Sequence, residues 1–319
     1  MKIKYSEIFG GNTSNRPTFQ GEGKYTGAPS LWLRYFGCNM SCKGFGQKNP
    51  IDPSTYEFDY PNFDFSKIKS IDEVPMITKG CDSAYSWSSQ FKHLIPEHTA
   101  SEVVDVLQSK LTGGTFVHPK SNQDCHMVFT GGEPMLRGWQ STTIDIFKEF
   151  ETRKIVPKHV TFETNATQVA SKEFIEYFTD LNATQNSNFM WNQISKNNMF
   201  EYTHTTEIFW SCSPKLYTSG ESWDKAIRPE VIKSYMAVSD KGQLKYVVDG
   251  SERAWEEVEK ATKMYREIGC NWDVWIMPVG SDIQQQEANA AKISDEALAR
   301  GYNVAPRVHV YVYLNAQGR

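Results

Sequence analysis

From about residue 99 onward, short apolar runs alternate with amphipathic stretches of helical period, and this alternation constrains the fold more than any other feature. Helices are expected at 171–181 and at 252–268, where the second pattern stops at Gly269. The apolar runs, which are typical of buried strands, lie at 126–130, 160–163, 207–211, 244–248 and 273–277. Strands that alternate with helices pair in parallel through right-handed crossovers. The sequence therefore predicts an α/β fold.

Unusual segments follow the carboxyl ends of four predicted strands. These segments are Gly131-Gly132-Glu133-Pro134, Glu163-Thr164-Asn165, Ser213-Pro214-Lys215 and Met277-Pro278. A β/α barrel assembles its active site at this face. One such placement is expected by chance, whereas four favour a shared site.

Three of the six cysteines, Cys38, Cys42 and Cys81, lie in polar loops beside glycines. An iron–sulfur cube held by three protein thiolates keeps one iron open for an outside ligand. Two cysteines four residues apart also fit half of a zinc site, and unpaired cysteines are most often small buried hydrophobic residues. Spacing alone leaves these alternatives open. The remaining cysteines, interpreted as structural, are Cys125, Cys212 and Cys270.

The composition favours a single domain, 1–319, that acts on a small-molecule substrate. The chain has 319 residues, of which 39% are hydrophobic, and a formal net charge of −4 with a pI near 6.0. Nothing indicates a broad phosphate-binding surface, so no direct contact with nucleic acid is expected. No stretch resembles a signal peptide or a membrane span, and six scattered cysteines are not a disulfide framework, so we expect a cytoplasmic location.

Two insertions are expected, at about 43–80 and 182–206. The first is too rich in aromatic residues for a disordered linker and is expected to pack as a flap. It could shield a metal site, dock a partner or serve no function. The second insertion is polar and rich in asparagine.

Several segments resemble the 7-carboxy-7-deazaguanine synthases, which are radical S-adenosylmethionine (SAM) enzymes. The matching segments are Phe19-Gln20-Gly21-Glu22-Gly23, Gly27-Ala28-Pro29, Leu33-Arg34-Tyr35-Phe36-Gly37-Cys38-Asn39 and Cys81-Asp82-Ser83-Ala84-Tyr85-Ser86-Trp87. The third family cysteine normally follows the second by three positions, but position 45 is Phe45 and residues 43–80 precede Cys81. Either an insertion leaves Cys81 in place, which we favour because the family pattern continues after it, or the third ligand is lost, with Cys212 as a replacement. Long insertions cost little closure entropy.

The resemblance implies a partial TIM-like β/α barrel of the radical SAM type, with inserted loops. It also implies conversion of 6-carboxy-5,6,7,8-tetrahydropterin to 7-carboxy-7-deazaguanine and ammonia, on the way to queuosine or other 7-deazaguanine nucleosides. The cofactors would be a [4Fe-4S] cluster on Cys38, Cys42 and Cys81, SAM, and Mg²⁺ at Ser83. A one-electron donor such as flavodoxin or ferredoxin and a possible homodimer are further expectations.

The resemblance also assigns the site residues. Those that would hold SAM are Gly131, Gly132, Glu133, Asn165, Ser213, Lys215, Met277 and Pro278. Those that would contact the pterin substrate are Gln20, Glu22, Arg34, Thr130 and His309, the last on a final strand within 301–310. An arginine that points inward from an apolar strand such as that of Arg34 needs a carboxylate partner.

Two other classes of function stay open. A radical SAM enzyme of another class, such as a glycyl-radical activase, would share the cysteines but has no reason to carry Gln20, Glu22, Arg34 and His309. A non-catalytic protein that binds zinc or a partner would use Cys38 and Cys42 without an open iron.

Overall fold

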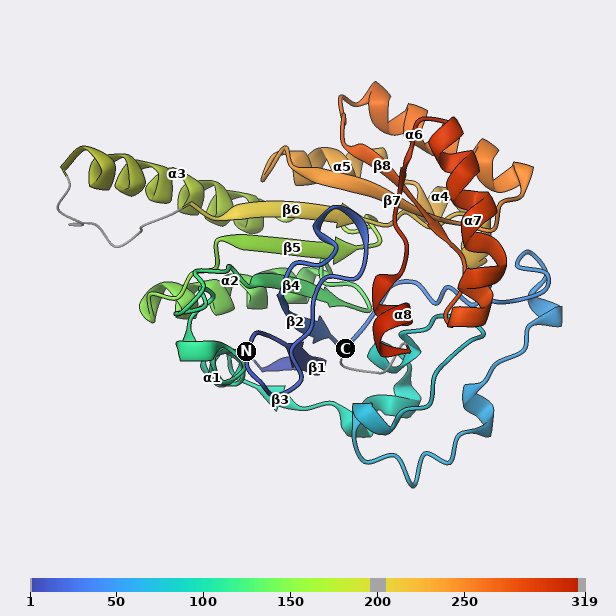
Figure 1. The fold of residues 1–319 in the computed structure, drawn as a ribbon, viewed down its shortest axis with the longest axis horizontal. Coiled ribbons are helices and arrows are strands. Elements are labelled where there is room, and N and C mark those ends of the chain that lie inside the picture. Colours follow the sequence, from blue (N-terminus) through green and yellow to red (C-terminus); the bar gives the residue numbers. More distant parts are fainter. Residues whose placement is uncertain (1, 196–204, 315–319) are drawn as a thin grey trace.

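A nine-stranded mixed sheet forms the centre of the molecule in this computed structural model, which describes residues 2–195 and 205–314 (Figure 1). The spatial order is β3-β1-β2-β4-β5-β6-β7-β8-β9. The strands are β1 Ile3–Gly10, β2 Ser30–Tyr35, β3 Glu97–His98, β4 His126–Gly131, β5 His159–Thr164, β6 Glu207–Cys212, β7 Gly242–Val248, β8 Asp273–Pro278 and β9 Asn303–Val304. Every pair from β2 to β9 is parallel, and β1 is antiparallel to β2 and β3.

Helices connect the parallel strands, as the alternating pattern predicts. They are α1 Ala100–Ser109, α2 Arg137–Thr152, α3 Lys172–Ser195, α4 Trp223–Ala226, α5 Pro229–Met236, α6 Glu252–Glu267, α7 Ile283–Ala299 and α8 Val308–Tyr313. The α/β class is therefore confirmed. The strand order begins at β3 and ends at β9, so the sheet is not closed, and the partial barrel stays a prediction. Among the described residues, no helix has the length and apolarity to span a membrane.

The outer face of the sheet is packed by stacked aromatic rings. Phe162 on β5 lies between Phe129 on β4, at 5.2 Å between ring centroids, and Trp210 on β6, at 5.0 Å. Trp210 stacks in turn on Tyr235 of α5 at 4.2 Å. All four side chains are fully buried. Side chains alternate between the two faces of a strand, so the residues before and after each of these strand aromatics point to the inner face.

The glycine-rich loop before β2 lies against that inner face. Gly23 has φ +69, which favours glycine, and it lies close to Gln243 on β7, since a Cβ there would be 2.4 Å from that side chain. Nearby, Tyr25 packs edge-on against His126 of β4 and Phe209 of β6. In Figure 1 this loop, in dark blue, crosses in front of β5 and β6. Tyr25 thus fills the amino end of the inner face, and residues 20–22 lie toward the carboxyl end.

Two expected elements are wrong in their extent or type. The helix expected at 171–181 continues to Ser195, because residues 172–195 include no glycine or proline that would stop it. Much of the 182–206 insertion is therefore helix, and 196–204 lies outside the described residues. The last strand is only Asn303–Val304, and His309 lies in α8 instead. Pro306 has no amide hydrogen to continue a strand ladder.

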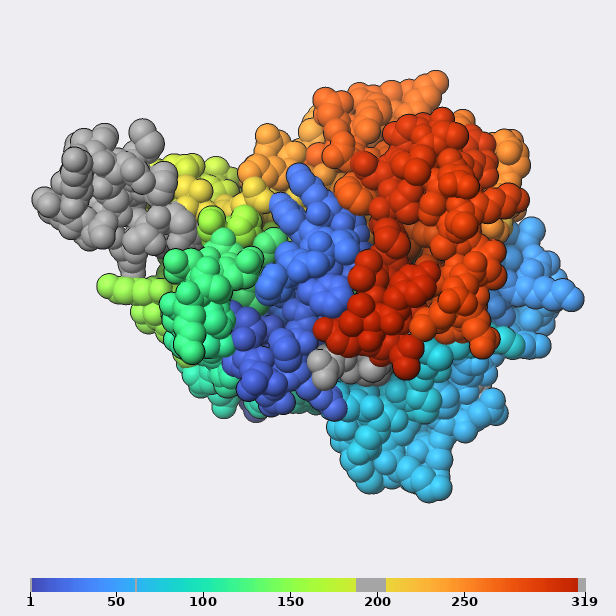
Figure 2. All heavy atoms as spheres, in the orientation of Figure 1, coloured from blue at the N-terminus to red at the C-terminus, as the bar shows by residue number. Residues whose placement is uncertain are grey.

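The 43–80 segment packs around an apolar cluster of its own. Its Ile68, Ile71 and Val74 are buried against Tyr85 and Phe91, which follow Cys81 in the chain. Short 3₁₀ turns, such as Ile71–Glu73, are its regular structure. Figure 2 shows it as a lobe in light blue and cyan at the lower right. The segment is therefore packed onto the protein rather than extended as a linker.

Acidification from pH 6.5 to 4 is expected to destabilise the fold through His126. Burial and the neighbouring His159 lower the pKa of His126 to about 4, although Asp124 and Glu207 oppose the shift. Between these pH values the unfolded chain binds a proton that the folded chain excludes, so the free energy of unfolding falls as the pH falls.

Urea unfolding should show that the wild type loses roughly 2 kcal/mol more free energy of unfolding across this window than His126→Phe does. His126→Phe keeps a ring against His159, at 4.5 Å in the wild type, and should show a smaller loss. An equal pH dependence in both proteins would contradict the assignment.

Candidate functional site

A cavity of about 300 Å³ opens at the carboxyl ends of the parallel strands. Its wall contains all but one of the predicted site residues: Gln20, Glu22, Arg34, Cys38, Cys42, Cys81, Ser83, Thr130, Gly131, Gly132, Asn165, Ser213, Lys215, Met277, Pro278 and His309. Apolar side chains, among them Phe9, Trp32 and Phe45, complete the wall. Segments separated by most of the chain therefore share one chamber.

The three loop cysteines lie in one corner of this cavity. Cys42 is buried with Met40 and Ala226, and Cys38, Phe45 and Cys81 pack against them. All six cysteines of the chain are free thiols. Burial raises the pKa of each loop thiol, that of Cys38 to about 12. Cys212, the possible replacement ligand, is fully buried in the main core, away from the cavity wall.

A neck at the base of the 43–80 insertion brings Cys81 back beside Cys42. The Gly80 amide donates to the Phe45 carbonyl at 2.7 Å. Gly46 has φ +68, and a Cβ there would lie 2.2 Å from the Thr78 carbonyl, so the two sides of the neck touch through backbone. Asp59 fastens the second side, since its Oδ2 accepts the amides of Thr78 at 2.5 Å and Lys79 at 2.9 Å. The insertion begins and ends at one point.

Within the described residues, no group of three His, Cys, Asp or Glu side chains could hold a metal ion together. A single metal ion needs several ligands on one atom, whereas an iron–sulfur cube is held by thiolates bound to its separate irons. The cysteines fit such a cube in their chemistry: they are free, share one corner and face an open cavity. Ser83, which donates to Asp82 at 3.3 Å, presents one hard hydroxyl oxygen to the same cavity.

Glu133 is the predicted residue that does not line the cavity. Its carboxylate is fully buried and accepts the Thr164 hydroxyl at 2.6 Å and the Asn165 amide at 2.7 Å. Burial raises the pKa of Glu133 to about 7, although these hydrogen bonds oppose the shift. The carboxylate thus joins the ends of β4 and β5. Asn165 in turn donates to Asn39, beside Cys38, at 3.0 Å.

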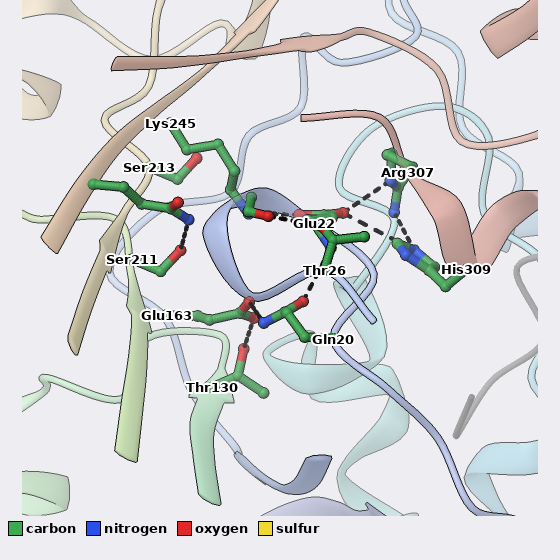
Figure 3. Close-up of polar contacts among 12 residues, drawn as sticks. Gln20, Glu22, Thr26, Thr130, Glu163, Ser211, Ser213, Lys245, Arg307 and His309 are labelled. Atoms are coloured by element: carbon green, nitrogen blue, oxygen red, sulfur yellow. Dashed lines mark hydrogen bonds and ion pairs between the residues drawn. The ribbon is translucent and has the colours of Figure 1, made fainter. Parts of the chain in front are cut away.

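Glu22 is the charge centre of the opposite wall. It accepts from Lys245 of β7 at 2.5 Å and from Arg307 at 3.1 Å, and His309 lies 3.9 Å away (Figure 3). Burial acts to raise the pKa of Glu22, but Lys245 and Arg307 outweigh it and hold the pKa well below its usual range. Burial and Arg307 lower the pKa of His309 to about 4. At neutral pH the site therefore presents an ionised Glu22 and an uncharged imidazole.

A second polar set lies below Glu22 in Figure 3. Gln20 donates to Oε1 of Glu163 at 3.1 Å, and Thr130 donates to Oε2 at 3.1 Å. Arg34, on the same wall, pairs with Glu7 at 2.8 Å. Glu7 of β1 therefore supplies one carboxylate partner to Arg34, through its Nε.

The sequence interpretation gave no role to four charged residues of the wall, Asp82, Glu163, Lys245 and Arg307, although the first two lie in segments that it had singled out. Lys245 is a lysine inside an apolar strand, so the argument applied to Arg34 could have found it. Arg307 carried no such signal, because it precedes α8 in an irregular segment. Its guanidinium bonds Glu22, the Gly280 carbonyl at 2.9 Å and Asp82 at 2.9 Å. It ties the carboxyl-terminal segment to three parts of the wall.

Comparisons with known proteins give distant similarity over the whole chain, and no family model matches. The chain is 22% identical over 303 residues to a 7-carboxy-7-deazaguanine synthase from Rhodopirellula baltica, with 94% of this chain and 84% of the relative covered. It is 22% identical over 319 residues to a protein of the same name from Pyrobaculum aerophilum, with 100% and 98% covered. The crystal structure of QueE from Escherichia coli has a TM-score of 0.49 and 15% identity, with 97% of this chain and 95% of that chain covered.

Removing the Asp59 carboxylate is expected to loosen the neck. In Asp59→Ala the amides of Thr78 and Lys79 lose their acceptor, which should lower the free energy of unfolding by about 1 kcal/mol. Hydrogen exchange of the peptide around 77–81 should accelerate in the metal-free protein. The matched control is Asp72→Ala, which removes an exposed carboxylate of the same lobe that pairs with Arg16 outside it. Equal exchange in the two variants would show that Asp59 does not hold the neck.

Proposed function

We propose that this chain is a radical SAM enzyme that converts 6-carboxy-5,6,7,8-tetrahydropterin to 7-carboxy-7-deazaguanine and ammonia. One observation carries the proposal: three free cysteines, the four singled-out strand ends and the glycine loop with Gln20 and Glu22 all line a single cavity. The two relatives named 7-carboxy-7-deazaguanine synthase support it.

Cys38, Cys42 and Cys81 would hold a [4Fe-4S] cluster, which when bound supplies the electron that cleaves SAM to start the radical reaction. Other residues of the cavity wall would bind SAM. Gly131 and Gly132 pack closely against the backbone of Tyr35 and Gly37, and the part of the cavity that they line would receive the methionine part of SAM. The ammonium of Lys215 would pair with the SAM carboxylate.

Other strand ends would complete the SAM site. Asn165 and Ser213 would bond the ribose, and Met277 and Pro278 would pack against the adenine. Glu133 is buried against Thr164 and Asn165. We therefore assign it to holding Asn165 in place rather than to contact with SAM.

The Glu22 side of the cavity would bind the pterin. Gln20 and the ionised Glu22 offer an amide and a carboxylate acceptor to the ring N–H groups. Arg34 would meet the substrate carboxylate, with Thr130 and the neutral His309 as further hydrogen-bonding groups. Ser83 would give one ligand to a Mg²⁺ that also binds substrate. Phe9, Trp32 and Phe45 are apolar side chains of the wall that would limit water at the reacting atoms.

The test is anaerobic reconstitution with iron and sulfide, followed by incubation with dithionite, SAM, Mg²⁺ and 6-carboxytetrahydropterin. The wild type should form 7-carboxy-7-deazaguanine. Cys81→Ala should lose product by at least about a thousandfold, because a cluster without its third protein ligand no longer has a single open iron. Cys212→Ala, which removes the buried core thiol, should keep the activity.

The other outcomes separate the alternatives. A cluster that cleaves SAM without forming this product would indicate a radical SAM enzyme of another class. Failure of the wild type to bind iron and sulfide would favour a non-catalytic protein. Loss of product in Cys212→Ala but not in Cys81→Ala would move the third ligand to the core cysteine.

A further inference from the structure

The loop after β6 holds the cysteine loop through one carboxylate. Oε1 of Glu221 accepts the backbone amide of Ser41 at 2.7 Å and that of Cys42 at 2.9 Å. The Ser41 hydroxyl lies 3.4 Å from the same oxygen. The Glu221 side chain is only 7% exposed. Two consecutive amides therefore converge on one buried oxygen.

The backbone at Cys42 needs this support. Cys42 has φ +45, in the left-handed region that residues other than glycine seldom adopt. Such a conformation costs about 1 kcal/mol or more and persists only where the surroundings impose it. Successive amides that point to one side form a concave anion site. The Glu221 carboxylate occupies that site and so stabilises the turn that carries the Cys42 thiol.

The contact between the two loops is close over several residues. The Gly44 amide donates to the Ser219 carbonyl at 2.9 Å, and a Cβ on Gly44 would lie 2.5 Å from the Gly220 nitrogen. Ala226 of α4 is fully buried with Met40 and Cys42. Lys225 bonds the other Glu221 oxygen at 2.6 Å. That pairing turns Oε1 toward the amides.

We propose that Glu221 is a positioning residue of the cysteine loop, which fixes the Ser41–Cys42 turn and thereby the direction of the Cys42 thiol. The loop that starts with Ser213 and Lys215 also carries Glu221. The carboxylate therefore sets the distance between the cysteine corner and that wall. The role toward a bound cluster rests on the proposed function, whereas the role in the turn does not.

The test compares Glu221→Ala, Glu221→Gln and Lys225→Gln. Glutamine keeps a carbonyl oxygen for the two amides, alanine keeps none, and Lys225→Gln removes only the half-exposed ion pair. In the metal-free protein, hydrogen exchange of the peptide around 39–44 should rise about tenfold or more in Glu221→Ala and much less in the other two. After reconstitution, the rate at which a chelator removes iron should follow the same order.

Hydrogen exchange tests the role of Glu221 in the turn, and iron binding tests the proposed function. Unchanged exchange in Glu221→Ala would overturn the proposal, as would equal exchange and iron loss in the alanine and glutamine variants. A general loss of stability is recognised because it would accelerate exchange equally in α1, which packs on β1, β3 and α2. If the wild type binds no iron, the proposed function fails, and exchange in the metal-free variants still decides the role of Glu221.

Discussion

Burial of the Glu22 carboxylate is the constraint on which the arrangement of the cavity depends. An ionised group removed from water needs charged partners, and Glu22 takes them from β7 and from the segment before α8. Arg307 then bonds Asp82, next to Cys81, so the glycine loop, the sheet and the cysteine segment are joined by one network. The energy gained by any single pair is small, but removal of one partner leaves a charge buried without compensation.

Much of the fold was predictable because short apolar runs alternate with stretches of helical period, and such a pattern can be recognised from a few consecutive residues. Apolar runs mark the strands of a parallel sheet, and polar residues at their ends mark the functional edge. Gln20, Glu22 and Arg34 could be proposed because their segments resemble a known family. Lys245 was missed although its charge inside an apolar strand was a usable signal. The length of α3 was underestimated because its polar second half was interpreted as an insertion.

The rest of the site could not be predicted, for a physical reason. The neck of the insertion and the turn held by Glu221 depend on backbone amides as donors. Every residue except proline carries such an amide, so the sequence does not show which ones will be bonded. Their acceptors, Asp59 and Glu221, look like ordinary surface acids among 38 in the chain. His309 was expected in a strand, and the structure forms a short helix there that still points its imidazole into the cavity.

The closed neck at Phe45 and Gly80 has a consequence for how such chains can diverge. Because the excursion leaves and re-enters at one point, residues can be added to its outer turns without any movement of the cysteines on either side, provided that Asp59 still holds the neck. The exposed residues of the lobe therefore tolerate substitution and insertion, whereas the apolar residues that pack against Tyr85 and Phe91 are tied to the cavity wall. Selection could then act on the outer surface of the lobe independently of the chemistry beneath it.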